Sequence, residues 1–363
     1  MSPFAERPAF PSSTPPGETE RPPMPTRSIA QLGEDLAAQV RRVIVGHDDA
    51  VELLAVALLC EGHILVEDVP GIGKTTLART VAQCLDCQFA RIQFTPDLLP
   101  TDVTGLFFFN QRSGDFEFRA GPVHANVILA DEINRATPRT QSSLLEAMQE
   151  RQVTVEGHTM PLPRPFLVIA TQNPVELEGT FPLPEAQLDR FFLRLSLGYP
   201  SEQDEIRILR RFAGPNEPEP VTPIATADDV VAAGREVREV YVADEIAAYV
   251  VAVARATREH ESVELGASPR ASLALFRAAQ ALAALRGRAY VTPDDVKRLV
   301  EPVLAHRLVL RHQHRLRGAG AQRVLGSILE SLPVPAEPIG AGERRTAGDG
   351  SLEQMPVQPR THE

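Results

Sequence analysis

The stretch HILVEDVPGIGKTTLA (63–78) constrains the fold of this 363-residue chain more than any other part of the sequence. It begins with a short apolar strand pattern, passes through a glycine-rich turn and continues as a helical pattern from Lys74. In this arrangement backbone N–H groups and the positive end of the helix face the same space, which suits an anion. The stretch therefore predicts a phosphate-binding loop inside an α/β domain.

This loop departs at one position from the usual pattern G-x-x-x-x-G-K-[ST]. Gly73, Lys74 and Thr75 are in place, but Asp68 stands where the first glycine would be. The N–H groups that wrap a phosphate are those nearest Gly71, Gly73 and Lys74, whereas position 68 lies earlier, where the chain leaves the strand. Asp tolerates unusual backbone angles better than most residues, and its carboxylate can point away from the phosphates. We therefore expect the loop to bind nucleotide despite Asp68.

Strand and helix patterns alternate over the first half of the chain. The apolar or β-branched runs are HILV (63–66), ARIQF (90–94), NVILA (126–130), FLVIAT (166–171) and FFLRL (191–195). Buried strands separated by helices favour a parallel sheet that is covered on both faces, here with five strands. Two further segments alternate around a turn and predict inserted hairpins, namely LFFFNQRSGDFEFRA (106–120) and QVTVEGHTMPL (152–162).

No strand pattern returns after the proline-rich stretch GPNEPEPVTPIA (214–225). Apolar residues recur at helical spacing in the segments 226–240, 243–260, 268–287 and 292–310. We therefore expect an α/β domain over 28–199 and a small all-helical domain over 200–332. The segments 1–27 and 333–363 are dense in Pro and polar residues and are expected to be disordered.

The composition excludes several classes of protein. A net charge of −11 disfavours a protein that coats nucleic acid, because phosphate contacts need a basic surface. No apolar run approaches the ~20 residues that span a bilayer, and the N-terminus lacks an apolar signal core. We therefore expect a cytoplasmic protein without a membrane segment. Cys84 and Cys87 have metal-site spacing, but no second pair completes a ligand set, so we expect them to fill a helix face.

An acidic pair follows one of the strand patterns. VILADEIN (127–134) is an apolar run that ends in Asp131 and Glu132. Beside a phosphate loop, Asp131 can hold Mg²⁺ through its water shell while the Thr75 hydroxyl is a direct ligand. The next carboxylate, Glu132, can polarise an attacking water. The pair therefore predicts a site that hydrolyses a nucleotide.

An amide follows the neighbouring strand pattern, FLVIATQNP (166–174). The carboxyl ends of parallel strands share the edge at which ligands bind, so Asn173 would emerge near Asp131. There it can orient the attacking water or bind the γ-phosphate. The alternative is that Asn173 only forms a turn before Pro174.

Three cations occupy first turns of predicted helices, where the helix dipole disfavours them unless an anion compensates. They are Lys74, Arg139 in Thr-Pro-Arg and Arg270 in Ser-Pro-Arg, two patterns typical of a cap followed by Pro at the first helical position. Their placement suggests that bound anions, shared among these cations, compensate the unfavourable positions. The alternative for the two arginines is pairing with surface carboxylates, which contributes little.

These motifs together resemble those of the MoxR family of AAA+ ATPases over about residues 30–330. The segments that carry the resemblance are VEDVPGIGKTTLA, RIQFTPDLLPTDVTG, ILADEINRATPRTQSSLLEAMQERQVTVEG, IATQNPVELEGTFPLPEAQLDRFF and SPRASLALFRAAQALA. The resemblance implies an AAA+ P-loop domain, a helical lid, ATP and Mg²⁺ between them, and assembly into a ring, commonly a hexamer.

The resemblance also implies a role for individual positions in the site. Lys74 and Thr75 resemble the Walker A pair, Asp131 and Glu132 the Walker B pair, and Asn173 sensor 1. The implied nucleotide-binding positions are Val45, Gly46, Pro70, Gly71, Ile72, Gly73, Lys74, Thr75, Thr76 and Asp131. After Gly46, beside the adenine, the family usually has Gln where this chain has His47, which bears on base contacts.

Two arginines are implied to complete the site. Arg190 in LDRF is similar to the arginine finger that reaches the γ-phosphate of a neighbouring subunit; the alternative is a salt bridge with Asp189. Arg270 resembles sensor 2, which would reach the phosphate in cis as the lid closes. Hydrolysis would then require a subunit interface.

The resemblance favours a chaperone-like ATPase that remodels a partner or helps to insert a metal or cofactor. Its partner would be a separate protein with a von Willebrand factor A domain or another client, and the hairpin at 106–120 would face the pore or that partner. A DNA-acting motor is the alternative, disfavoured by the net charge and the acidic hairpin residues Asp115 and Glu117. A scaffold with negligible turnover is a third hypothesis, against which Glu132 and Asn173 argue.

Overall fold

The computed structural model describes residues 28–68, 71–172, 179–212, 221–312 and 320–335. Segment 1–27, most of segment 333–363, Pro70 and Asn173 lie outside these residues. Within the described ranges, no helix combines the length and apolar character that crossing a membrane requires.

A five-stranded sheet forms the centre of the first half of the chain, as the alternating pattern predicts. Its strands are β1 (Ile64–Glu67), β2 (Phe89–Gln93), β5 (Val127–Asp131), β8 (Leu167–Gln172) and β9 (Leu193–Leu195). They lie in the order β2-β5-β8-β1-β9, and every neighbouring pair is parallel. The carboxyl ends of the strands therefore share one edge, called the carboxyl edge below, and their beginnings share the opposite amino edge.

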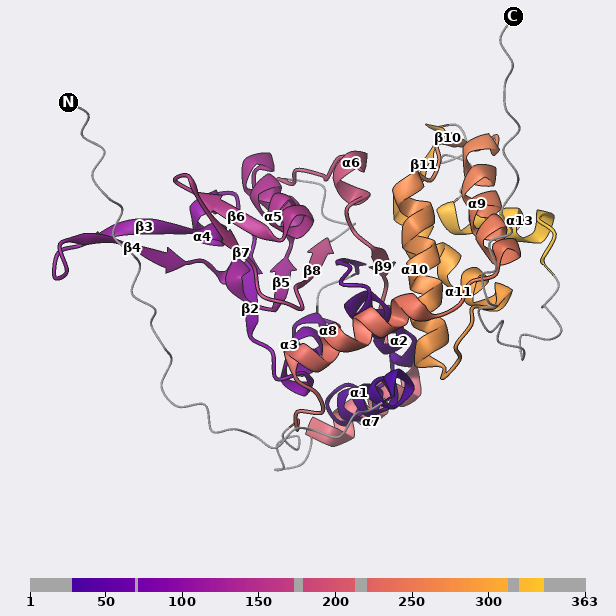
Figure 1. Ribbon diagram of the computed structural model, residues 1–363, viewed down its shortest axis with the longest axis horizontal. Helices are drawn as coiled ribbons and strands as arrows, with labels where there is room; N and C mark the ends of the chain where they lie inside the picture. The colour runs from indigo at the N-terminus through magenta and orange to yellow at the C-terminus, as the bar shows by residue number, and fades with distance from the viewer. Residues whose placement is uncertain (1–27, 69–70, 173–178, 213–220, 313–319, 336–363) are drawn as a thin grey trace, which may run out of the picture.

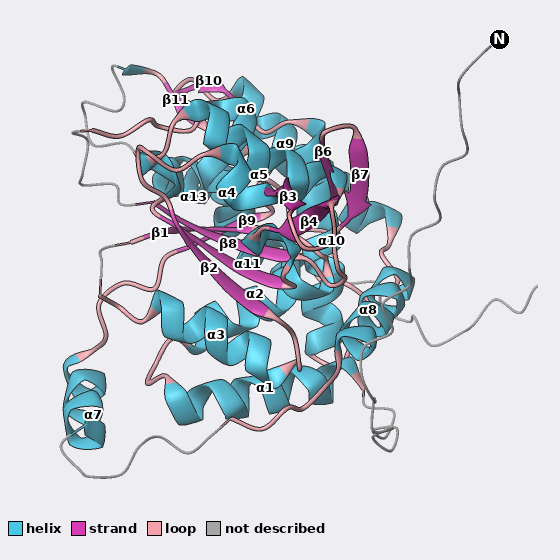
Figure 2. Ribbon diagram, turned by 90° about the vertical axis from the view of Figure 1, so that its left-hand side faces the viewer, coloured by secondary structure: helices cyan, strands magenta, loops and turns pink. Residues whose placement is uncertain are grey.

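Helices cover both faces of this sheet (Figure 2). Ile64 and Val66 pack in the cluster that contains the apolar residues of α1 (Ile29–Val43), α2 (Asp48–Leu59) and α3 (Lys74–Cys84). The residue between them, Leu65, packs on the other side with α5 (Pro138–Glu150). This alternation follows from the two-residue period of a strand, and each fully buried aliphatic side chain contributes about 1.5–3 kcal/mol.

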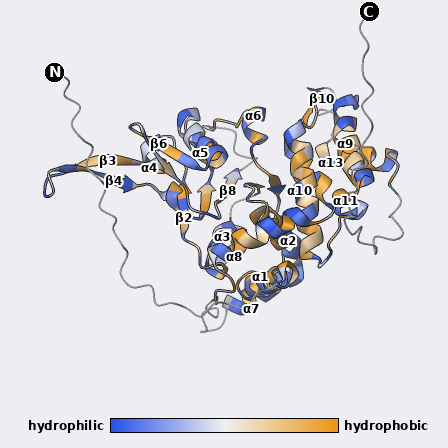
Figure 3. Cartoon of the chain, in the orientation of Figure 1, coloured by the Kyte–Doolittle hydropathy of each residue, from blue (hydrophilic) through white to orange (hydrophobic). Residues whose placement is uncertain are grey.

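The two predicted hairpins are present. The first joins β3 (Gly105–Asn110) to β4 (Asp115–Ala120) after the short helix α4 (Pro100–Thr104), and it projects from the body of the molecule (Figure 1). Apolar residues recur along it, where the ribbon is orange in Figure 3. Several of their side chains are exposed, with Phe116 at 70% of its full accessibility. The second hairpin joins β6 (Gln152–Val155) to β7 (His158–Pro161).

The second half of the chain is mainly helical, and all four predicted helices form. They are α8 (Ala227–Glu236), α9 (Asp244–Glu259), α10 (Pro269–Leu285) and α11 (Pro293–Leu304). The remaining elements with bounds are α6 (Glu185–Leu188), α7 (Glu202–Phe212), α13 (Ala321–Ser331), η1 (Pro122–His124), η2 (Ile133–Arg135), η3 (Val237–Glu239) and η4 (Ala305–Arg307). An antiparallel pair, β10 (Val263–Leu265) and β11 (Val309–Leu310), adds strands that the all-helical expectation lacks. Strands of two or three residues leave no readable period in a sequence.

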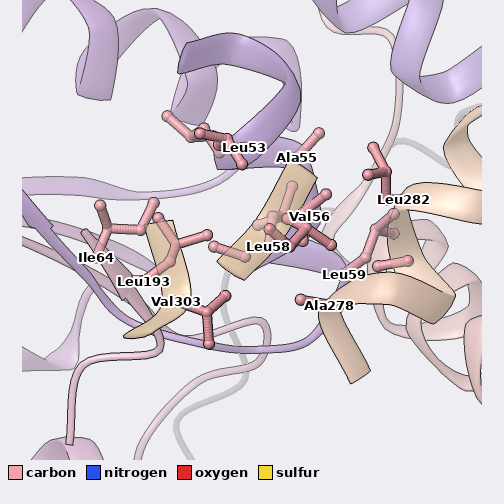
Figure 4. Packing of buried hydrophobic residues seen from close by; sticks show 14 of the residues in the cluster. Leu53, Ala55, Val56, Leu58, Leu59, Ile64, Leu193, Ala278, Leu282 and Val303 are labelled. Atoms are coloured by element: carbon pink, nitrogen blue, oxygen red, sulfur yellow. The ribbon is translucent and has the colours of Figure 1, made fainter. Parts of the chain in front are cut away.

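One apolar cluster runs from the sheet into the helical half of the chain. Figure 4 shows Val303 of α11 beside Leu193 of β9, and Leu282 of α10 beside Leu59 of α2. Close packing at this junction extends to α8, where a Cβ on Gly234 would stand 2.7 Å from the Leu59 carbonyl. The helical half is therefore fastened to the sheet domain by a shared core.

The cysteines of CLDC are packing residues. Cys84 ends α3 fully buried, and burial raises the pKa of its thiol to about 12. Burial likewise raises the pKa of Cys87 to about 11. Among the residues that the structure describes, no group of three or more His, Cys, Asp or Glu side chains could hold a metal ion.

Candidate functional site

A cavity of about 350 Å³ opens at the carboxyl edge, between the loop after β1 and the ends of β2, β5 and β8. Its lining comprises Asp68, Gly71, Gly73, Lys74, Thr75, Thr76, Arg91, Gln93, Asp131, Glu132, Thr171 and Gln172. The phosphate-loop residues and the acidic pair, which the sequence predicts to lie together, therefore share this cavity.

The loop has the backbone that a phosphate cradle requires. Gly71 and Gly73 have φ angles of 86° and 92°, in the left-handed region that other residues disfavour. A Cβ at either position would meet no atom within 4 Å, so the requirement for glycine here is the backbone angle and not lack of space. Helix α3 begins at Lys74, so its first N–H groups face the cavity side of the loop.

The Asp68 carboxylate binds another loop of the protein and does not contact Lys74. The Asp68 side chain is buried, and its carboxylate accepts hydrogen bonds from Ser196 Oγ (3.0 Å), from Gly198 N (3.2 Å) and from the main-chain N of Leu197. These partners belong to the loop that follows β9. Only the main-chain carbonyl of Asp68 contacts the loop cation, accepting from Lys74 Nζ at 3.0 Å. The carboxylate is thus directed away from the lysine, as expected from the sequence.

Thr171, at the end of β8, links the two acids after β5. Its hydroxyl donates to Asp131 Oδ1 at 2.7 Å and accepts from the main-chain N of Glu132 at 2.8 Å. Glu132 has a φ of 57°, a left-handed conformation that costs a residue with a Cβ about 1–2 kcal/mol. The hydrogen bond from its N–H helps to hold this strained turn, so Thr171 fixes the direction in which both carboxylates leave the strand.

Two side chains of β2 contact the acids, and sequence reasoning missed both. Arg91 donates to Asp131 Oδ2 at 2.7 Å, and Gln93 Nε2 donates to Glu132 Oε2 at 2.9 Å. Positions 91 and 93 lie on the same face of a strand because side chains alternate. That spacing is visible in the sequence, but only the observed β2–β5 pairing places it beside the acids.

The loop that carries Val45 and Gly46 does not line the cavity. It joins α1 to α2 and packs against α7, where a Cβ on Gly46 would lie 3.2 Å from Asp204 Oδ2. The φ of 79° at Gly46 also favours glycine. The structure therefore shows a constrained loop at this position, while its contact with a base stays a prediction.

Arg190 lies at the amino edge of the sheet, and Lys74 lies at the opposite, carboxyl edge. Phe192 N donates to His63 O at 2.7 Å just before β1 begins, and β9 then runs parallel to β1. Lys74 follows the carboxyl end of β1, about 13 Å further along at ~3.3 Å per residue. Within the described residues no ion pair engages Arg190, and its neighbour Asp189 pairs with Arg307 instead. The alternative Asp189–Arg190 salt bridge is not formed.

Arg270 lies in the first turn of α10, at the amino edge and two residues after Ser268, and its contact with the phosphate of its own subunit stays a prediction. The cap of its helix, Ser268, donates to the Asp189 carboxylate at 3.0 Å. Arg270 itself is exposed and absent from the cavity lining. Sequence patterns define the helix start correctly, but they do not reveal the side of the sheet on which the helical half packs. Arg139, in the first turn of α5, is also exposed and outside the cavity.

Two protein-family models match the chain. The model described as ATPase family associated with various cellular activities (AAA) matches residues 63–193, and the AAA lid domain model matches residues 255–325. The first covers the sheet from the start of β1 to β9, and the second covers the helical half from α9 to α13.

Several relatives are similar over most of their length. Chaperone MoxR1 of Mycobacterium tuberculosis is 45% identical over 82% of this chain and 81% of the relative, and the uncharacterized protein YeaC of Bacillus subtilis is 49% identical over 82% and 93%. Protein MoxR of Methylorubrum extorquens is 31% identical over 82% and 93%. A crystal structure of a protein classed as an ATPase, from Cytophaga hutchinsonii, superposes with a TM-score of 0.80 at 39% identity, covering 85% of this chain and 96% of the other.

Proposed function

Because this chain belongs to the MoxR family of AAA+ ATPases, we propose that it hydrolyses ATP at the contacts between protomers of a ring and thereby remodels or matures a partner protein. Six protomers, the number common in the family, form the proposed ring. The proposed domains are an ATPase domain over 28–199 and a lid over 200–332, and the proposed location is the cytoplasm.

The observation that carries this proposal is the convergence of Lys74, Thr75, Asp131 and Glu132 on one cavity. In the proposed mechanism the loop N–H groups and Lys74 bind the phosphates of ATP. Glu132, held by Gln93 and by its strained backbone, accepts the proton of the attacking water. Asn173, which lies outside the described residues, is proposed to orient that water.

The oxygen donors in the cavity suit Mg²⁺, which prefers hydroxyl, carboxylate and water ligands. Thr75 would bind the ion directly and Asp131 through water, and Mg²⁺ would offset negative charge on the phosphate oxygens. The Asp131 carboxylate is paired with Arg91 at 2.7 Å, so Arg91 holds this carboxylate at the wall of the cavity and balances part of its charge.

Arg190 and Arg270 are proposed to act on the nucleotide of the neighbouring protomer. Both lie at the amino edge, whereas the cavity opens at the carboxyl edge, so contact in trans accounts for both positions at once. Supplied in this way, an arginine finger is worth roughly 10³–10⁵ in rate. A protomer without a neighbour is expected to hydrolyse ATP slowly.

The hairpin β3–β4 is the proposed contact with the partner protein. Phe109 and Phe116 stack edge to face, with centroids 5.4 Å apart, while 53% and 70% of their accessible surface stays exposed. Exposed aromatic pairs of this kind favour protein contacts. A separate protein with a von Willebrand factor A domain, or another client whose metal or cofactor is being inserted, is the proposed partner.

Two substitutions in the cavity test the ATPase site. Lys74→Ala should abolish ATP binding measured by calorimetry, whereas Lys297→Ala on α11 is the matched control. Glu132→Gln should retain binding and lower kcat about 10²-fold or more, with the exposed Glu146→Gln as control. Equal hydrolysis before and after Glu132→Gln, at concentrations that allow assembly, would refute the role of Glu132. Stimulation of hydrolysis by DNA would favour a motor instead.

A further inference from the structure

A buried arginine joins the helical half of the chain to the segment that carries Arg190. Arg307, in η4, is 3% exposed, and its Nε donates to Asp189 Oδ1 at 2.8 Å. Its other N–H groups donate to main-chain carbonyls of Phe191 (2.6 Å), Phe192 (3.2 Å), Asp189 (3.4 Å) and Val303. A guanidinium has five N–H donors, and here each has an acceptor.

The same carboxylate also binds the start of α10. Ser268 caps this helix by accepting from Ala271 N at 3.3 Å, and its hydroxyl donates to Asp189 Oδ2 at 3.0 Å. Asp189 directly precedes Arg190, and Ser268 lies two residues before Arg270. One carboxylate thus fixes the backbone next to both arginines, although the two belong to different halves of the chain.

We propose that Asp189, Ser268 and Arg307 form a positioning unit that sets Arg190 and Arg270 on one face, ready to contact the nucleotide of the adjacent protomer. This inference rests on the proposed function. None of the three residues touches the nucleotide; each acts through one of the two arginines.

The charges support this assignment. Burial lowers the pKa of the Arg307 guanidinium, Asp189 opposes that shift, and the nearby Arg270 cation adds to it. His306, whose Nε2 donates to Phe191 O at 3.1 Å, adds no charge, because burial holds its pKa well below the usual value. Asp189 is therefore the carboxylate that balances cations which would otherwise repel one another. Apolar packing would join the two halves at least as well, so the ion pair is better explained by geometry than by stability.

Kinetic constants separate positioning from folding. Asp189→Asn, Ser268→Ala and Arg307→Lys should each lower kcat for ATP, about tenfold or more for Asp189→Asn. The KM should stay within about twofold, because the cavity at the carboxyl edge is untouched. The exposed Asp228→Asn on α8 is the matched control and should behave as wild type. An unchanged kcat in folded Asp189→Asn protein, or a raised KM at constant kcat, would overturn the proposal.

Mixed assemblies test whether the defect is passed to the neighbour. Glu132→Gln protomers keep an intact arginine face but do not turn over, and Asp189→Asn protomers keep an intact cavity. Mixed together they should hydrolyse ATP several-fold faster than the sum of the separate samples. Absence of recovery contradicts the positioning unit. If Asp189→Asn does not fold, Ser268→Ala takes its place, because it removes a single hydroxyl.

The Arg190→Ala variant tests separately whether Arg190 acts in trans and whether Asp189, Ser268 and Arg307 position it. A slow Arg190→Ala protein together with a fully active Asp189→Asn protein overturns the positioning unit alone. A fully active Arg190→Ala protein overturns the proposed function in trans as well.

Discussion

Replacing Asp68 by Gly restores the glycine that the phosphate loop lacks, yet we expect it to harm the protein. The exchange removes the acceptor of two main-chain N–H groups, those of Leu197 and Gly198, and of the Ser196 hydroxyl. Each buried N–H left without an acceptor costs about 1–3 kcal/mol, while the hydroxyl can turn to water. The free energy of unfolding should therefore fall by about 3 kcal/mol. ATP affinity should change less than tenfold, because Lys74 contacts only the main-chain carbonyl of residue 68.

Urea unfolding of the nucleotide-free protein measures the first quantity, and calorimetric titration with a non-hydrolysable ATP analogue measures the second. Glu156→Gly is the control, since the exposed Glu156 has a φ of 50° and exchange to glycine there relieves an unfavourable backbone angle. Glu156→Gly should be neutral or stabilising. An Asp68→Gly protein of wild-type stability would show that the carboxylate does not anchor the loop after β9. An Asp68→Gly protein that binds the analogue orders of magnitude more tightly would show that the carboxylate represses nucleotide binding.

Three further outcomes follow from the described contacts. His63 is buried with both ring nitrogens hydrogen-bonded, and burial lowers its pKa from 6.5 to about 4. The stability that neutral His63 contributes is therefore complete above pH 6.5 and is lost as the pH falls toward 4. Between pH 7.5 and pH 5 the free energy of unfolding of wild type, measured in urea, should fall by about 2 kcal/mol more than that of His63→Gln. Thr171→Val should lower kcat about tenfold while ATP binding persists in a calorimetric titration, because the hydroxyl that fixes both acids is gone; a wild-type kcat would contradict this. Gly73→Ala should weaken ATP binding, because the φ of 92° at this position disfavours any residue with a Cβ. Gly326→Ala in α13 is the control, because a Cβ there meets open space; it should raise the free energy of unfolding by about 0.5–1 kcal/mol in the same assay.

Local signals in the sequence were enough to predict most of the helices and strands, apart from the short pair β10 and β11, and part of the site. Helix starts at Lys74, Pro138 and Pro269 agree with the structure because caps and prolines act within a few residues. The cradle and the acidic pair could be placed together because parallel strands share a carboxyl edge. These inferences needed no knowledge of strand order.

Features that depend on long-range packing could not be predicted. Arg91 and Gln93 reach the acids because β2 pairs with β5, and the anchor role of Asp68 exists because β9 lies beside β1. The position of Arg270 depends on the face against which the helical half packs. In each case the decisive contact joins residues dozens of positions apart, where a single sequence carries no periodic signal.

The core shared by the two halves has a mechanical consequence. An interior packed this tightly resists internal bending, so the two halves of one subunit are expected to move together as a unit. In the proposed ring, a change at the phosphates would then appear as a rotation of one whole subunit against the next. The projecting hairpin β3–β4 would be displaced together with the whole subunit that carries it.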